Sequence, residues 1–154
     1  MSIHFYFKKR RGLSNFELEK ILAKEKSFIG CFSQDDLPTS IKLPVTMIIN
    51  TANKQHKGKH WIAVRINKKS CLYFDTFGLY PIEAKINHFL QKFSKKILYS
   101  SVCIQNINSY YCGFYCIAFI KMVKNIDSYK TFVNFFHPFS SKKNDTIVKK
   151  ILEQ

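Results

Sequence analysis

The sequence predicts an α+β fold, with helices packed on a sheet whose strands are mostly antiparallel. Two apolar segments, 60–66 and 71–75, are separated by the polar turn 67–70, so they should pair as an antiparallel hairpin. The run 113–123 is almost entirely apolar and has helical length, which predicts a helix buried in the core. With 154 residues, the chain suits one domain rather than two.

Capping signals and periodicity predict the remaining elements. Ser14 and Glu17 fit a capping box, which predicts a helix over about 15–25. The other expected elements are a buried strand over 45–50, a helix over 82–94, a weakly alternating strand over 97–104 and an amphipathic helix over 145–152. Residues 1–13 are expected to be a basic arm that precedes a catalytic domain over 14–154.

The charge of the chain is strongly positive. Lys and Arg number 25 against 10 Asp and Glu, which leaves a formal charge of +15. Such an excess favours a polyanionic partner such as nucleic acid, bound through its phosphates. The alternative is a surface that lysine merely solvates, and the two interpretations carry equal weight. The basic residues are dispersed along the chain, which suits backbone contacts better than base reading.

Five cysteines, an odd number with no Cys-x-x-Cys pair, argue against a disulfide framework and against a structural zinc site. We expect reduced thiols. His56 and His60 share helical spacing, but the residues between them lack the glutamate of a zinc protease, so no metal is expected. The apolar stretches are too short to cross a bilayer, and a soluble, intracellular protein is expected.

Cys112 stands where a reactive thiol is expected. It begins the buried helix after the polar loop 106–109, so the positive end of the helix dipole would face its sulfur. Gly113 would leave room for a substrate backbone to approach. The alternative is an ordinary buried thiol, which is common for free cysteine. The position at the loop-to-helix junction favours the nucleophile, whereas Cys116, one turn further on, is assigned to core packing.

His60 and Asp75 are the expected base and its orienting acid. His60 opens one strand of the hairpin and Asp75 closes the other, so antiparallel pairing places them at the same end of the sheet. Asp75 would fix the imidazole tautomer, and His60 would take the proton of the Cys112 thiol. A histidine at a strand start is more often a surface residue. The presence of Asp75 and Cys112 in suitable positions favours the catalytic interpretation of His60.

Two further side chains complete the expected site. Gln105 lies seven residues before Cys112, where its amide could donate to an oxyanion together with the Cys112 backbone amide. A lone glutamine before a loop is usually only a polar surface residue, and the spacing is the reason to single it out. Trp61, beside the base, is expected to bind substrate as one wall of a narrow channel, with simple core packing as the alternative.

Three blocks of the sequence, taken in order, resemble the active-site blocks of the adenovirus protease (adenain) family. They are His60-Trp61, the stretch 73–78 and the stretch 105–116, within a weaker likeness that runs from about 14 to 122. The wider family includes the proteases that cleave ubiquitin-like modifiers. Those enzymes usually have an aspartate before the cysteine where this chain has Tyr111, so the chain is more similar to the adenovirus type.

The resemblance implies a papain-like, permuted α+β fold, in which a central helix with Cys112 packs on the sheet that bears His60 and Asp75. It implies a catalytic Cys112, His60 and Asp75, with Gln105 and Cys112 forming the oxyanion hole. A family member would be a thiol endopeptidase that cleaves viral precursor and structural proteins after small residues, notably glycine, during virion maturation. It would act in the virion and the infected cell.

The resemblance also implies partners. No cofactor would be required for the chemistry, but DNA and a short viral peptide would activate the enzyme. Cys103 does not fall where the family binds that peptide, so a disulfide-linked peptide is not expected. A monomer without membrane contact is expected. Two alternatives stay open: an isopeptidase that removes ubiquitin or a related modifier, and a basic DNA-binding protein with a vestigial active site.

Overall fold

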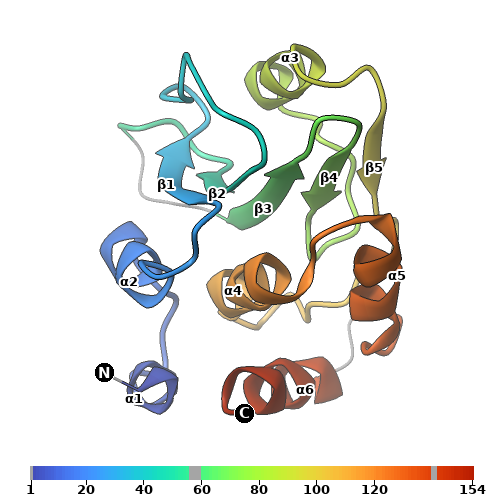
Figure 1. The fold of residues 1–154 in the computed structure, drawn as a ribbon. Coiled ribbons are helices and arrows are strands. Elements are labelled where there is room, and N and C mark those ends of the chain that lie inside the picture. The colour runs from blue at the N-terminus through green and yellow to red at the C-terminus, as the bar shows by residue number, and fades with distance from the viewer. Residues whose placement is uncertain (1, 56–59, 140–141) are drawn as a thin grey trace.

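The computed structural model describes residues 2–55, 60–139 and 142–154, in which one sheet is packed between helices (Figure 1). The five strands lie in chain order and are β1 (Phe28–Ser33), β2 (Val45–Asn50), β3 (Trp61–Ile66), β4 (Cys71–Phe74) and β5 (Ile97–Tyr99). The central strands β2, β3 and β4 are antiparallel, and the expected hairpin is confirmed as β3 and β4. The outer pairs, β1–β2 and β4–β5, are parallel, so the sheet is mixed rather than mostly antiparallel.

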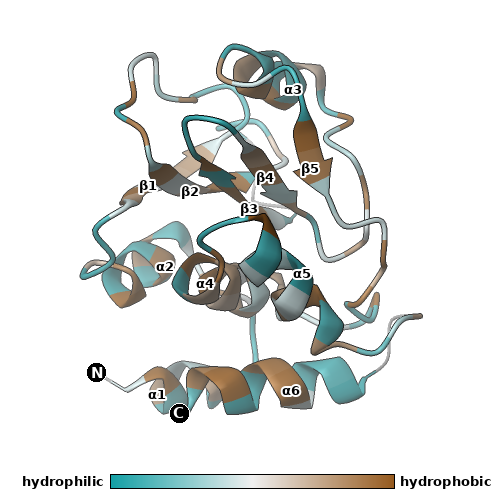
Figure 2. Cartoon of the chain, turned by 45° about the vertical axis from the view of Figure 1, so that its right-hand side comes forward, coloured by the Kyte–Doolittle hydropathy of each residue, from teal (hydrophilic) through white to brown (hydrophobic). Residues whose placement is uncertain are grey.

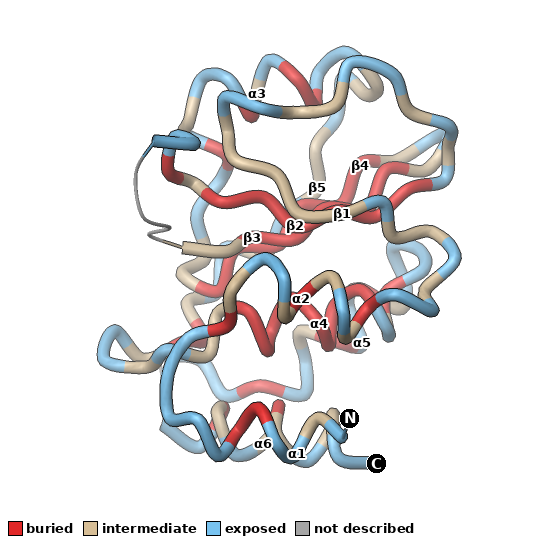
Figure 3. The backbone as a smooth tube through the Cα atoms, turned by 90° about the vertical axis from the view of Figure 1, so that its left-hand side faces the viewer, coloured by how far each residue is buried: buried red, intermediate tan, exposed pale blue. Residues whose placement is uncertain are grey.

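Six helices are present in the described residues: α1 (Ile3–Phe7), α2 (Asn15–Ile21), α3 (Ala84–Gln91), α4 (Cys112–Met122), α5 (Ile126–Asn134) and α6 (Lys143–Leu152). Helix α3 covers one face of the sheet, and α2, α4 and α5 cover the other (Figure 3). Helices α1 and α6 form a further layer beyond α4, where the two termini lie close together (Figure 1). Along α6, apolar and polar residues alternate, as expected for an amphipathic helix (Figure 2).

Side-chain alternation along the strands supplies two separate cores. Ile48, Ala63 and Leu72 point towards α4, while Met47 and Val64 point towards α3. Because both faces of the sheet are covered, every residue of β2 is buried. The buried apolar helix that the sequence predicted is confirmed as α4, in which residues 113–120 are all buried.

Three elements lie outside the sequence predictions. Helix α1 has five residues, too few for an apolar period, and β1 is interrupted by Gly30, where the pairing register shifts. Helix α5 begins at a capping box of Asn125 and Ser128, a signal that the sequence does carry. The strand expected over 97–104 is shorter, because the chain leaves the sheet after Tyr99. After Tyr99 the chain leaves the sheet and runs towards the start of α4.

No helix within the described ranges combines the length and the apolar character needed to cross a membrane.

Candidate active site

His60 and Asp75 meet at one end of the central hairpin. His60 directly precedes β3 and Asp75 directly follows β4, and His60 Nε2 lies 2.9 Å from Asp75 Oδ1. Both side chains are mostly buried. The backbone N–H of Phe77 donates to the same carboxylate oxygen at 2.8 Å, and the Phe77 ring lies against the imidazole at 4.7 Å between centroids. The carboxylate therefore fixes the orientation of the ring.

The turn after Asp75 depends on Gly78. Its φ of 73° is in the left-handed region, and a Cβ atom there would lie 2.7 Å from the Ser101 carbonyl oxygen. A side chain at this position would push the turn away from the segment around Ser101. Since the Gly78 N–H donates to the Asp75 carbonyl at 2.9 Å, the turn also holds Asp75 in place.

Cys112 is the other partner of His60. Burial alone would lower the pKa of His60, but hydrogen bonds to Asp75 and to Cys112 outweigh it and raise the pKa to about 9. Because Nε2 faces Asp75, Nδ1 is the ring nitrogen left for the sulfur. The imidazole thus lies between a carboxylate and a thiol, and the arrangement favours its protonated form.

Helix α4 places the sulfur of Cys112 at its first turn. The N-cap residue, Tyr111, makes no side-chain cap hydrogen bond, so no capping side chain occupies the first amides of the helix. The positive end of the helix dipole lies at this turn and favours negative charge on the sulfur.

Three of the other four cysteines, Cys31, Cys71 and Cys116, differ from Cys112 in their surroundings. None of the five cysteines, all within the described residues, forms a disulfide. Burial raises the pKa of Cys31 and of Cys71 to about 12, and it raises that of Cys116 well above its usual value. These three thiols are therefore held in the neutral form, which is unreactive.

Gln105 is almost completely buried, at 2% exposure, beside the catalytic residues. Its Oε1 accepts a hydrogen bond from Thr76 Oγ1 at 2.6 Å, and its Nε2 donates to the Ser109 carbonyl at 3.0 Å. A side-chain amide has two N–H donors, so the second can serve an oxygen atom in the adjoining cavity. The position suits an oxyanion donor rather than a polar surface residue.

A cavity of about 460 Å³ brings the candidate catalytic residues together. It is lined by residues that include Gly12, Leu13, His60, Trp61, Gln105 and Cys112. A second hollow of about 450 Å³ is also lined by Leu13 and Trp61, so the two hollows adjoin each other at these residues. Trp61 Nε1 donates to the Leu13 carbonyl at 2.9 Å, which makes the indole a wall between the two hollows.

Gly113 has a different role from the one expected. It is buried, it does not line the cavity, and a Cβ atom there would lie 3.3 Å from Leu13 and 3.4 Å from Leu18. The absence of a side chain lets residues 12–13 approach helix α4. The expectation that Gly113 makes room for substrate is therefore corrected: it makes room for the wall of the cleft.

That wall belongs to the N-terminal arm, whose residues 8–13 we call the strap. Lys9 Nζ and Arg11 Nη1 each lie 2.7 Å from the carboxylate of Glu17. Glu17 also completes the expected capping box with Ser14. Burial alone would raise the pKa of Glu17, but hydrogen bonds from Arg11 and Lys9 outweigh it and lower the pKa to about 2. One carboxylate therefore anchors the strap to α2.

We expect Glu17→Gln to raise KM for a peptide substrate and to lower the free energy of unfolding by roughly 1 to 2 kcal/mol. Glutamine keeps the helix cap but loses the attraction for Lys9 and Arg11, so the strap loosens. The unfolding term from Glu17 is present above its ordinary pKa of 4.5 and is lost as the pH falls through about 2. Urea unfolding and steady-state kinetics at pH 7 measure both effects.

The matched control is Glu25→Gln, which removes a carboxylate 3.6 Å from Lys121 and away from the cavity. It should change KM little and the free energy of unfolding by less than about 1 kcal/mol. Equal KM values for the two variants would contradict a strap held by Glu17.

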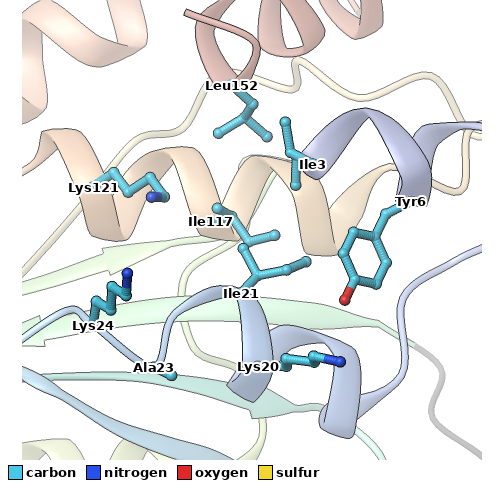
Figure 4. A pocket seen from close by; sticks show the side chains of 9 residues that line it. All are labelled: Ile3, Tyr6, Lys20, Ile21, Ala23, Lys24, Ile117, Lys121 and Leu152. Atoms are coloured by element: carbon cyan, nitrogen blue, oxygen red, sulfur yellow. The ribbon is translucent and has the colours of Figure 1, made fainter. Parts of the chain in front are cut away.

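Another hollow, of about 350 Å³, lies among α1, α2, α4 and α6 (Figure 4). Aliphatic side chains such as Ile117 form its floor, and Lys20, Lys24 and Lys121 stand around it. Its nine described lining residues include no Cys, His, Asp or Glu, so it supplies no group for acid–base or nucleophilic chemistry. In the described ranges no group of three or more Cys, His, Asp or Glu could hold a metal ion, and His56 lies outside those ranges.

No protein-family model matches the chain. No curated protein matches it either. Among solved structures, the ASFV pS273R protease is similar at a TM-score of 0.52 and 16% sequence identity, over 94% of this chain and 68% of that one. The expected α+β, papain-like class is confirmed by this likeness. The chain therefore shares its fold with that protease, and helix α4 with Cys112 packs against the sheet that ends next to His60 and Asp75.

Proposed function

We propose that the protein is a cysteine endopeptidase of the adenovirus-protease type, which cleaves viral precursor and structural proteins during virion maturation. The observation that carries this proposal is the position of His60, which is hydrogen-bonded to Asp75 and lines the same cavity as Cys112, whose proximity helps to raise the pKa of the imidazole. A buried acid, an imidazole and a thiol in that order form the constellation used for acyl transfer.

The mechanism follows from these contacts. His60 Nδ1 takes the proton of the Cys112 thiol, and the sulfur attacks the carbonyl carbon of the scissile peptide bond. The resulting oxyanion accepts hydrogen bonds from the Gln105 amide and the Cys112 backbone N–H. His60 then gives its proton to the leaving amine, which leaves a thioester on Cys112. Water, deprotonated by His60, attacks the thioester and releases the acid.

The cleft limits which peptides can reach Cys112. Trp61 and the strap are joined by the bond between Trp61 Nε1 and the Leu13 carbonyl, so the wall between the two hollows is closed by a hydrogen bond. An extended substrate in the cavity of Cys112 would lie against this wall, and bulky side chains next to the scissile bond would collide with the indole. We propose that residues before the cleaved bond are small, glycine above all.

We also propose that DNA and a short viral peptide are partners of the enzyme. A formal charge of +15 gives the enzyme affinity for the backbone of DNA, along which it would reach substrates in the virion or the infected cell. No cofactor is needed for the chemistry, while DNA and a short viral peptide would raise the activity of a monomeric enzyme.

A peptide-library cleavage assay, run with and without DNA, tests the proposal. We expect cleavage after small residues, stimulation by DNA at low salt, and inactivation by iodoacetamide with the label on Cys112 before any other cysteine. Mass spectrometry locates the label. Faster labelling of Cys112 by a ubiquitin-vinyl probe than cleavage of any peptide would show an isopeptidase instead. Tight DNA binding with a Cys112 no more reactive than a model thiol would show a vestigial site.

A further inference from the structure

The side-chain amide of Gln105 has to face one particular way to stabilise an oxyanion. Its N–H group must point into the cavity, because the oxygen end would repel the negative charge that develops there. Oxygen and nitrogen ends of an amide have nearly the same shape, so packing alone does not choose between them. The choice depends on the hydrogen-bond partners of Gln105.

Two partners set that orientation. The Ser109 carbonyl oxygen can only accept, so it requires the nitrogen end of Gln105, which lies 3.0 Å away. The oxygen end is then met by the hydroxyl of Thr76, which donates at 2.6 Å in a fully buried position, since Thr76 is 1% exposed. With Ser109 taking one N–H and Thr76 holding the oxygen, the second N–H is the part of the amide left for the cavity.

Thr76 also holds the backbone that carries Gln105. Its carbonyl accepts from the N–H groups of Ile104 and Gln105 at 2.8 and 3.2 Å. On the other side of this segment, Asn144 Nδ2 of α6 donates to the Ile104 carbonyl at 2.8 Å. The backbone is therefore fixed independently of the Thr76 hydroxyl, and loss of the hydroxyl alone would free the amide group without moving the segment.

We infer that Thr76 is a positioning residue for the reaction, which fixes the Gln105 amide with its free N–H towards the oxyanion. This inference rests on the proposed protease function. Thr76 follows Asp75 directly, so one turn after β4 orients both the general base, through the Asp75 carboxylate, and the oxyanion donor, through the Thr76 hydroxyl. The two contacts thus come from adjacent residues of the chain.

Thr76→Val tests the inference, because valine keeps the shape and removes the hydroxyl. We expect kcat for peptide cleavage to fall roughly tenfold, a part of the hundredfold or more that loss of an oxyanion donor costs. KM should stay within about twofold, since the interaction is made in the transition state. The rate of Cys112 alkylation by iodoacetamide should not change, because that reaction has no oxyanion. Thr76→Ser should restore kcat.

The matched control is Thr46→Val, which removes a buried hydroxyl that lies 3.1 Å from Ser27 Oγ. Thr46 pairs with Arg65, at the end of the sheet away from His60, so kcat should not change. Thr76→Val with wild-type kcat, a failure of Thr76→Ser to restore activity, or an equal loss in Thr46→Val would each overturn the inference. So would a parallel fall in the alkylation rate, which would indicate general damage to the site.

A second measurement separates this inference from the proposed function. In the NMR spectrum of the whole protein, the two Gln105 side-chain N–H signals should be distinct and slow to exchange, and Thr76→Val should make their exchange faster. Unchanged signals in the variant would overturn the positioning role even if cleavage were impaired. If Thr76→Val makes the exchange of the Gln105 signals faster but the wild-type protein cleaves no peptide, the protease function alone is refuted.

Discussion

Replacement of Cys112 by alanine is expected to lower kcat/KM for peptide cleavage by a factor on the order of 10⁵ to 10⁶. The variant keeps the cleft, His60, Asp75 and Gln105, but it has no atom that can form the acyl-enzyme. Binding of the same peptide, measured by fluorescence anisotropy, should be nearly unaffected because the thiol adds little contact area. A decrease confined to kcat, with substrate affinity retained, is the expected signature.

Cys116→Ala is the control for this variant. Cys116 lies one turn further along α4 and is completely buried, so the same substitution removes a sulfur from the same helix. It should cost about 1 kcal/mol of stability through a small cavity and leave kcat almost unchanged. Residual activity of Cys112→Ala within a hundredfold of the wild type, or similar losses in the two variants, would contradict Cys112 as the nucleophile.

Asp75→Asn is expected to lower kcat by about 10⁴-fold, the order found when an orienting aspartate is replaced in a serine protease. The neutral amide neither fixes the useful tautomer of His60 nor stabilises the imidazolium. The pKa of His60 should therefore fall from about 9, because burial, which lowers it, is no longer outweighed. Ring-proton NMR titration measures this pKa directly.

The pH dependence of the free energy of unfolding should also depend on Asp75, through the pKa of His60. Since the folded pKa of His60 is raised above its ordinary value of 6.5, protonated His60 stabilises the fold fully below pH 6.5, and the contribution is lost as the pH rises through about 9. Asp75→Asn should remove most of this dependence, whereas Asp127→Asn, an exposed aspartate in α5, should retain it. A His60 pKa that does not move in Asp75→Asn would contradict the assigned pair.

The residues of the candidate site could be predicted because each stands where one element meets a loop. His60 and Asp75 flank a hairpin whose register follows from hydrophobic pattern and turn, so their proximity is a local consequence of pairing. Cys112 follows from the start of an apolar helix. Local pattern does not predict that the hairpin and the helix pack with these residues side by side. That expectation came from the resemblance to a known family.

The strap and the partner of Gln105 could not be predicted in this way. Residues 1–13 were expected to be a basic arm because of their lysines and arginines, and the pattern did not indicate that Phe7 stacks on Phe114 at 4.3 Å or that Leu13 is buried. The hydrogen bond between Thr76 and Gln105 joins residues 29 positions apart, and the spacing of apolar residues does not predict it. Parallel pairing of the outer strands likewise depends on long connections, which local pattern does not determine.

The bond from Asn144 to the Ile104 carbonyl has a consequence for a chain that is still being made. Residues 12–13 of the cleft leave the ribosome well before α6, but the segment that carries Gln105 is held by Asn144 of that helix. A nascent chain without α6 therefore lacks one of the hydrogen bonds that hold the backbone next to Gln105, however much of its sheet has formed. If the chain is the proposed protease, its full activity therefore requires that α6 has been translated and has packed against this segment.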